Sequence, residues 1–276
     1  MPIELPPGTA AESDENPPVE DGQLLQVIGV VVGLVLAIIL LLFWVSNQIV
    51  WWIPPQVEVQ LGRLMAQELA QAAEDSPRQQ ALAQLLDRLE DNLPVSDQRD
   101  FEVLLVDREQ VNALALPGQQ MVVFTGLLEV MESENELAMV LGHELGHFIN
   151  RDHLRTLTRQ LTLNLILVSI FPDTAGLQSL AVSGVRALSS AQFSQQQEQR
   201  ADEFGLEVLM ATYGHVNGAT DFFQRMQEDQ PGNAFAFLQS HPNPGDRVDY
   251  LQNLIATREY PLQERTPLSE TLKTNT

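Results

Sequence analysis

The sequence predicts a mainly helical α+β domain with a small β-sheet, preceded by one transmembrane helix. Three observations lead to this fold class. A long uncharged apolar run lies near the N-terminus, between Val27 and Val45. Short runs rich in β-branched residues follow between residues 101 and 125, and patterns of helical period occupy most of the remaining chain.

The apolar run is long enough to cross a membrane. Its nineteen residues would nearly span the hydrocarbon core of a bilayer, roughly 30 Å, as a helix. Trp44, Trp51 and Trp52 gather at its far end, where an interfacial aromatic belt would lie, and Pro54 and Pro55 end the helix. The preceding tail carries acidic residues and no basic one, which favours a retained anchor over a cleaved signal peptide.

These features divide the chain into four segments and indicate a single-pass membrane protein. The segments are an acidic tail expected to be disordered (1–22), the transmembrane anchor (24–53), a globular domain (56–260) and a loose C-terminal tail (261–276).

Composition narrows the chemistry. The formal net charge of −22 would repel phosphates, so nucleic acid is excluded as a partner. The chain has no cysteine, which excludes thiolate metal sites and cysteine catalysis. Any metal site must therefore use His, Asp and Glu side chains.

Within the globular domain, helical patterns cover residues 57–93, with a break at Ser76-Pro77. Residues 101–107 and 120–125 read as strands, and 111–116 as a strand between them. Further helices are expected at about 134–152, 154–171, 176–189, 195–213, 217–229 and 246–258. The apolar run Leu161–Phe171 is short, which indicates a buried core helix, with a membrane-dipping segment as the alternative.

The chemistry centres on the motif His143-Glu144-Leu-Gly-His147. Residues four apart lie on one helix face, so the imidazoles of His143 and His147 can bind one metal ion. Glu144 lies one step round the helix, where it can take a proton from water and pass it to a leaving amine. Gly142 and Gly146 are costly in a helix and indicate that a neighbour packs close against this face.

A catalytic zinc ion usually has three protein ligands, and the residues offer two candidates for the third. His153 completes a spacing similar to that of the metzincins, with Asn150 at their turn-glycine position. Glu198 lies on a later helix, with Asp202 on the same face as a partner for a ligating histidine. From spacing alone, two interpretations of Glu198 and Asp202 are equally supported: metal binding and an ordinary solvated helix face.

Four motifs together resemble the gluzincin family of the CAAX prenyl protease, the HtpX heat-shock protease and the mitochondrial Oma-type protease. They cover about residues 100–250, in the order found in the family. The motifs are Asn112-Ala-Leu-Ala-Leu-Pro-Gly118, Gly142-His-Glu-Leu-Gly-His147, Glu198-Gln-Arg-Ala-Asp202, and Ser240-His-Pro242 with Arg247. The resemblance implies a zincin-like domain over 56–260 that holds one Zn²⁺ per chain.

The resemblance also assigns roles to particular residues. It implies that His143, His147 and Glu198 bind the metal, with Asp202 behind them, and that His153 does not. It places His241 near the open metal position, either stabilising an oxyanion or blocking the metal in a resting state, and Arg247 close to the site. A substrate strand would add at a sheet edge over the cleft. The expected edge residues are Asn112, Gln120, Met121, Val122 and Val123.

The function expected from these features is a membrane-anchored zinc metalloendopeptidase with Glu144 as general base. Its substrates would be polypeptides, membrane or misfolded proteins, in quality control at the bilayer. The alternatives are a non-cleaving, membrane-tethered chaperone or scaffold that retains the fold, and a structural membrane protein with a chance motif. The intact set of chemical residues favours the enzyme.

Overall fold

The computed structural model describes residues 21–70, 76–94, 99–170, 188, 192–228 and 236–273. It separates into two compact units, Met1–Ser46 and Asn47–Thr276. The expected disordered tail, up to residue 20, lies outside the described residues. So does the expected helix at 176–189, apart from Leu188.

The first unit consists, in its described part, of most of helix α1 (Asp21–Ile49), and the 3-10 helix η1 (Val50–Trp52) continues the chain into the second unit. Among the described residues, the stretch Gly22–Trp52 is the one helix long and apolar enough to cross a membrane. Its most apolar window has a mean hydropathy of 3.1, and none of that window is buried. The predicted candidate transmembrane helix is therefore present.

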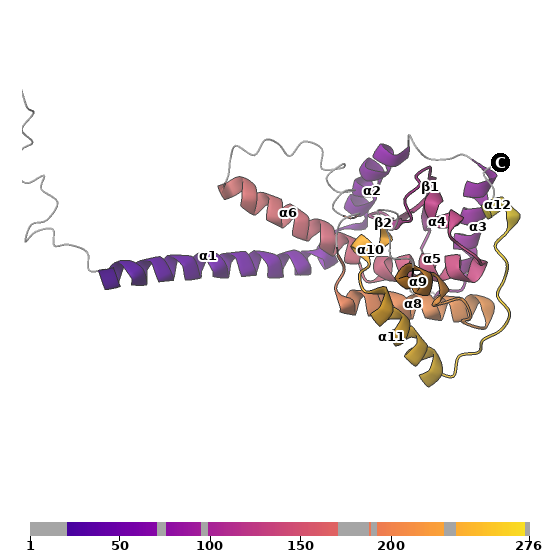
Figure 1. The fold of residues 1–276 in the computed structure, drawn as a ribbon. Coiled ribbons are helices and arrows are strands. Elements are labelled where there is room, and N and C mark those ends of the chain that lie inside the picture. Colours follow the sequence, from indigo (N-terminus) through magenta and orange to yellow (C-terminus); the bar gives the residue numbers. More distant parts are fainter. Residues whose placement is uncertain are drawn as a thin grey trace, which may run out of the picture. The chain divides into compact units, whose positions relative to one another are not determined.

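The second unit confirms the predicted fold class, since helices surround one small sheet (Figure 1). Serine N-caps fix several helix starts: Ser76, Ser133 and Ser194 each accept a backbone N–H from the first turn that follows. The strands are β1 (Glu102–Val106), β2 (Ala113–Leu116) and β3 (Gln120–Phe124). The helices are α2 (Pro55–Ala70), α3 (Pro77–Glu90), α4 (Thr125–Glu129), α5 (Glu134–Ile149), α6 (Asp152–Ile170), α8 (Gln195–Tyr213), α9 (Asp221–Glu228), α10 (Phe237–Ser240), α11 (Pro244–Thr257) and α12 (Glu270–Lys273).

The strand order β1-β3-β2 corrects one expectation. β3 pairs with β1 in parallel and with β2 in antiparallel fashion, so both of its sides are hydrogen-bonded. Gln120, Met121, Val122 and Val123 therefore lie in the central strand, and the expectation that they form a sheet edge is wrong. After β1, the chain forms the other outer strand, β2. The turn at Pro117–Gly118 then leads into β3, which lies between β1 and β2.

The two outer strands differ in how their edges are covered. On β1, the side-chain amide of Gln79 in α3 donates to the carbonyl of Val103 at 2.7 Å and accepts the N–H of Leu105 at 2.5 Å. This amide replaces a neighbouring strand and blocks further pairing. On β2, the Asn112 side chain accepts the backbone N–H of Ala113 at 3.0 Å.

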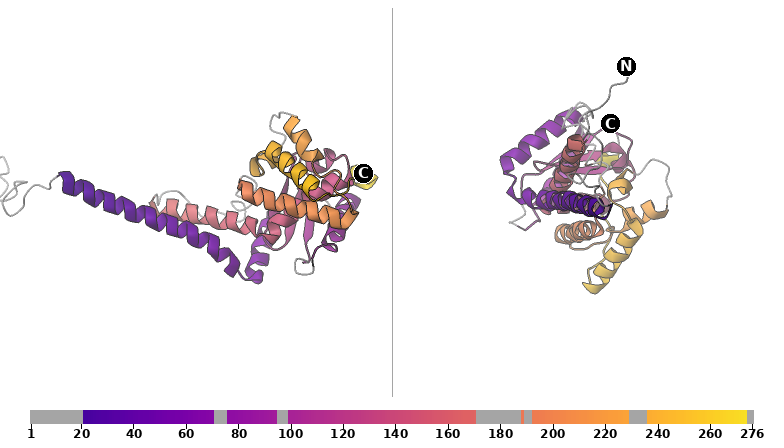
Figure 2. Two further views of the ribbon diagram at one scale, coloured as in Figure 1. Left: turned by 90° about the horizontal axis from the view of Figure 1, so that it is seen from below. Right: turned by 90° about the vertical axis from the view of Figure 1, so that its left-hand side faces the viewer.

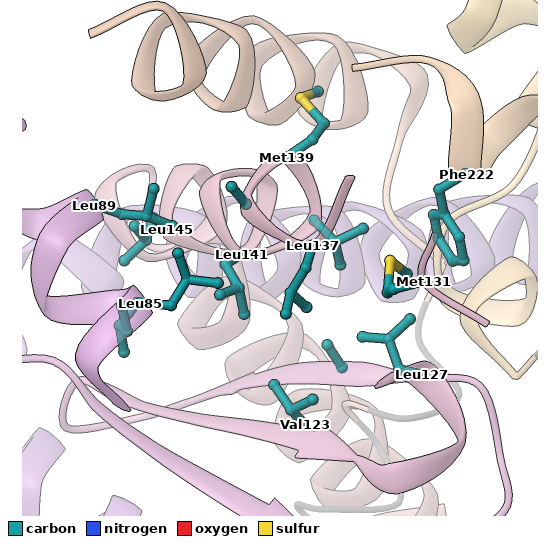
Figure 3. Packing of buried hydrophobic residues seen from close by; sticks show 14 of the residues in the cluster. Leu85, Leu89, Val123, Leu127, Met131, Leu137, Met139, Leu141, Leu145 and Phe222 are labelled. Carbon is teal, nitrogen blue, oxygen red and sulfur yellow. The ribbon is translucent and has the colours of Figure 1, made fainter. Parts of the chain in front are cut away.

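The main core lies between the sheet, α3 and α5. Leu85 and Leu89 from α3, Leu141 from α5 and Val123 from β3 point toward one another (Figure 3). Beyond α5, on the side away from the sheet, α8 packs along it, and α11 packs against α8 (Figure 1). α5 is thus covered on both sides and its interior positions from Asn135 to Phe148 are all buried.

Small residues let α5 and α8 approach closely. A Cβ atom added to Gly146 would lie 2.8 Å from the Cα atom of Ala201 and 3.1 Å from the Cβ atom of Phe204. One added to Gly142 would lie 3.0 Å from the Cα atom of Gly205. The prediction that a neighbour packs against the glycine face of the motif is therefore confirmed, and the neighbour is α8.

The described part of the segment expected to be a loose tail, residues 261–273, is mostly exposed but is anchored to the domain at two buried positions. Leu268 and Leu272 are buried in the main core, each 2% exposed. The carbonyl of Thr266 accepts the N–H of Glu134 at 2.9 Å, at the first turn of α5. These three contacts, two buried leucines and one backbone hydrogen bond to the first turn of α5, tie the segment to residues far away in the sequence.

Replacing Gly146 with Ala should destabilise the domain. In an exposed helix this change would stabilise by about 1 kcal/mol, but here the added methyl meets backbone, and overpacking costs about 1–3 kcal/mol. Denaturant unfolding of Gly146→Ala measures the change. Gly245→Ala is the matched control, because its Cβ would meet only the flexible side chain of Gln227. Equal stabilities of the two variants would contradict the close-packing account.

Candidate metal centre

Helix α5 brings three side chains of the His-Glu-x-x-His motif into one buried region. His143 and His147 are one turn apart, and their Nε2 atoms lie 3.1 Å from each other. Glu144 is 1% exposed. Its Oε1 atom has no hydrogen-bond partner among the described residues. An unpartnered buried carboxylate oxygen is costly unless water or a ligand satisfies it.

Two further donors reach this region from later parts of the chain. Glu198 lies in the first turn of α8, with one oxygen 3.5 Å from His147 Nε2 and the other 3.7 Å from His143 Nε2. His241 follows α10, and its Nδ1 atom lies 3.1 Å from His143 Nε2. One ligand atom from each of these four residues lies within 4.8 Å of all the others.

The spacing of these donors fits a zinc ion. Bonds of about 2.0–2.1 Å in a tetrahedral site put neighbouring ligand atoms about 3.4 Å apart. The two Nε2 atoms lie 3.1 Å apart, His147 Nε2 lies 3.5 Å from Glu198 Oε1, and His143 Nε2 lies 3.7 Å from Glu198 Oε2. Two imidazoles with one carboxylate are also a donor set that zinc commonly takes in catalytic sites.

The second nitrogen of each motif histidine contacts a carboxylate. His143 Nδ1 lies 2.9 Å from Asp202 Oδ1, and His147 Nδ1 lies 3.1 Å from Asp152 Oδ2. A carboxylate can only accept, so each Nδ1 carries the proton and donates it. In the neutral form of each ring the Nε2 lone pair then faces the common centre, which is the tautomer that a metal ligand requires.

Arg247, from α11, compensates the buried negative charge. Its Nε donates to Asp202 at 2.9 Å, and its Nη1 lies 3.1 Å from Glu198 Oε2. The guanidinium also lies over the ring of Phe223, 4.1 Å from its centroid. Burial alone would raise the pKa of Asp202, but Arg247 and His143 hold it below its usual value.

In the absence of metal, the pKa values of the two motif histidines are shifted in opposite directions. Burial, together with the charge of Arg247, lowers the pKa of His143 to about 4. Burial also disfavours the charged form of His147, yet the nearby carboxylates of Asp152 and Glu198 raise its pKa to about 10. At neutral pH the metal-free site therefore holds one proton on His147 that a metal ion must displace.

His153, the other predicted candidate for the third ligand, lies outside the donor cluster. Its Nε2 atom lies 3.4 Å from Glu58 Oε1 in α2. The turn between α5 and α6 causes this separation, with Arg151 at φ 55° and Asn150 in the right-handed helical region. The left-handed residue of the turn is thus Arg151, one position after Asn150, which stands at the turn-glycine position of the metzincin spacing.

Asp152 is a site residue that the sequence reasoning missed. It opens α6, is completely buried, and accepts hydrogen bonds from Gln197 at 2.8 Å and Arg155 at 2.9 Å as well as contacting His147. The available signal was an acidic residue at a helix start shortly after the motif. Acidic residues are also common in the first turn of helices, where they interact favourably with the helix dipole, so its position alone does not indicate a metal site.

The predicted edge residue Asn112 lies just before β2, at 1% exposure. Next to it, the carbonyl of Val111 accepts the backbone N–H of Phe237 at 3.0 Å. This bond ties α10 to the start of the outer strand. The ring of Phe237 stacks on that of His241, with centroids 4.2 Å apart, so α10 carries His241 to the site.

A helix with paired histidines and a glutamate, crossed by a second helix that supplies a carboxylate, defines a metallopeptidase. The chain belongs to Peptidase family M48, whose sequence profile matches residues 76–255. Members of this family use zinc.

Three similar curated proteins are proteases. "Metalloendopeptidase OMA1, mitochondrial" from Homo sapiens is 27% identical over 179 residues, 59% of this chain and 34% of its own length. "Mitochondrial metalloendopeptidase OMA1" from Arabidopsis thaliana is 33% identical over 156 residues, 55% of this chain and 31% of its own. "Beta-barrel assembly-enhancing protease" from Yersinia pestis is 31% identical over 169 residues, which are 55% of this chain and 34% of its own length. The chain thus spans about a third of the length of these relatives.

Zinc binding should release about one proton per ion at neutral pH, because His147 gives up the proton that its raised pKa retains. Since a raised pKa keeps this site protonated, the apparent zinc affinity should rise with pH by up to about tenfold per unit and level off near pH 10. Calorimetric titration of the metal-free protein in buffers of different ionisation enthalpy measures the proton. A binding heat that does not depend on the buffer would contradict this assignment.

Asp152→Asn should weaken zinc binding about 10- to 100-fold, the usual cost of losing a partner of a ligating histidine. The amide preserves the shape of the side chain but removes the charge that faces His147. Competition with a chromophoric chelator measures the affinity. Asp249→Asn is the matched control, because Asp249 is exposed on α11. Equal affinity in both variants would show that Asp152 does not orient His147.

Proposed function

We propose that this protein is a membrane-anchored zinc metalloendopeptidase. The observation that carries the proposal is the convergence of His143, His147 and Glu198 from α5 and α8, with both Nδ1 atoms bound to carboxylates. We assign these three residues as the zinc ligands, with one ion per chain. Asp202 orients His143, and Arg247 balances the charge of Asp202 and Glu198.

Zinc, when bound, would supply a Lewis acid that acidifies a water molecule to a pKa of about 7. Glu144 is the general base in this proposal. Its unpartnered, buried Oε1 can accept the proton of that water and deliver it to the leaving amine.

His241 contacts both halves of the site. Its Nε2 lies 3.4 Å from Glu144 Oε1, and its Nδ1 lies 3.1 Å from Glu198 Oε1. From this position an imidazolium or neutral N–H can donate to the oxyanion that forms on the scissile carbonyl. The same contacts suit a resting state in which the imidazole takes the place of a fourth donor.

The substrate strand is proposed to add along β2. Among the described residues, β2 pairs with a strand on one side, that of β3. Antiparallel pairing with β3 directs the backbone groups of Ala113 and Ala115 away from β3. The Asn112 side chain accepts the N–H of Ala113, so an extended peptide would bond the carbonyl of Ala113 and both backbone groups of Ala115. Asn112 begins this edge. Gln120, Met121, Val122 and Val123 support it from the central strand behind.

The anchor and the domain assignments complete the proposal. α1 holds the protein as a single-pass membrane protein. Residues 56–260 form the metallopeptidase domain, which the segment up to residue 273 extends. An active site tethered to a bilayer would meet membrane or misfolded proteins, so we propose a role in quality control at the membrane.

Glu144→Gln should retain bound zinc but lower peptide hydrolysis roughly 100- to 10,000-fold, the range expected for loss of a general base. The amide cannot accept the proton of water. The measurements are zinc content by atomic absorption and turnover of an unfolded protein substrate. Glu207→Gln, at an exposed carboxylate on the same unit, should leave both unchanged. Undiminished turnover in Glu144→Gln would remove this residue from the mechanism.

A further inference from the structure

The first half of helix α6 packs against the core, and its second half extends beyond the core. Leu154 and Leu157 are buried, at 1% and 7% exposure. Leu161 continues the same helical stripe one turn later and is 38% exposed. Both views in which α6 is seen from the side show it extending away from the other helices of its unit (Figures 1 and 2).

The outer half of α6 exposes apolar side chains on more than one face. Leu161 and Leu163 are 38% and 39% exposed. Residues two apart on a helix point about 200° from each other, so a single neighbouring element could not cover both. From Leu161 to Ile170 the sequence LTLNLILVSI has no charged residue. Apolar side chains exposed on opposite faces of a helix, as at Leu161 and Leu163, are typical of contact with lipid.

The inner half of α6 lies beside the end of the candidate membrane span. α6 contacts η1, which contains the last residues of that span. The guanidinium of Arg155 lies 5.4 Å from the ring centroid of Trp51. Trp51 and Trp52 are 55% and 83% exposed, as in an interfacial belt. If η1 lies at the bilayer surface, the adjoining part of α6 lies there too.

The exposed charge on α6 has the sign that anionic headgroups attract. Arg155 and Arg159 occur four residues apart, and Arg159 is exposed. Asp152, the acidic residue of this helix, is buried and pairs with Arg155 at 2.9 Å, so Arg159 is the charge left on the exposed surface. In a chain with 37 acidic and 15 basic residues, this local excess of positive charge fits phosphate groups near a membrane surface.

The length and internal bonding of α6 also fit lipid. The ten residues Leu161–Ile170 extend about 15 Å, half of a hydrocarbon core of roughly 30 Å. Thr162 donates its hydroxyl to the carbonyl of Thr158 at 2.8 Å, and Thr158 donates to that of Leu154 at 3.0 Å. These hydroxyls therefore stay satisfied without water.

We propose that α6 is a second membrane contact, whose outer half enters the leaflet nearest the domain while Arg159 binds phosphate at its surface. The inference rests on the proposed anchoring by α1. Because α6 starts at Asp152, which contacts His147, two contacts with the bilayer would fix the height and tilt of the metal centre. Substrate bonds close to the membrane surface would then be favoured.

Site-directed spin labelling of the full chain tests this proposal, and the absence of native cysteine makes each label unique. Leu163→Cys reports on α6, Ile38→Cys on α1, and Leu262→Cys, at 64% exposure, on a loop of the domain. The labelled proteins are placed in vesicles of phosphatidylcholine and phosphatidylglycerol. Collisions with oxygen, which partitions into lipid, are compared with collisions with a water-soluble nickel complex.

We expect the ratio of oxygen to nickel collisions to be several-fold higher at positions 163 and 38 than at 262. A lipid-exposed label at 38 with frequent nickel collisions at 163 would overturn the α6 contact alone. A label at 163 shielded from both reagents would also overturn it, since another protein surface or a second copy would then cover the helix. Nickel access at both 38 and 163 would overturn the anchor and the α6 contact together.

Discussion

The close contact between α5 and α8 is the constraint on which the rest of the structure depends. Gly142 and Gly146 on one helix meet Gly205 and Ala201 on the other, with no room for a further carbon atom. The carboxylate of Glu198 reaches the two imidazoles because the helix axes lie so close together. A wider separation would leave a histidine pair that binds metal weakly, with its third donor out of reach.

The same contact buries several charges, which must then compensate one another. Arg247 pairs with Asp202 and Glu198, while Asp152 and Asp202 hold the outer nitrogens of the histidines. A buried charge without a partner costs several kcal/mol, so the network is stable only as a set. Its inward-facing side, with the unpartnered Glu144 oxygen, is the part that a metal ion and water would complete. Stability and chemistry therefore depend on the same side chains.

The site was more predictable from the sequence than the sheet was. The four-residue spacing of His143 and His147 has one geometric consequence in a helix, so their convergence followed directly. Glu198 needed the resemblance to a family, because its approach depends on how two helices cross. The central place of β3 and the capping of β1 by Gln79 are set by tertiary contacts that leave no periodic pattern. Asp152 and the buried residues Leu268 and Leu272 were missed for the same reason, since their partners lie elsewhere in the chain.

The hydrogen bond between Thr266 and Glu134 has a consequence for how the domain matures. The two residues that close the first turn of the metal-binding helix are separated by well over a hundred positions, and the neighbouring bond from Thr266 to Asn135 spans 131. During synthesis, Ser133 can cap the start of α5 locally, but the N–H of Glu134 lacks its partner until the chain has grown past residue 266. Contacts of such high sequence separation form late and slow folding. The start of the metal-binding helix is therefore completed only when nearly the whole domain has been made.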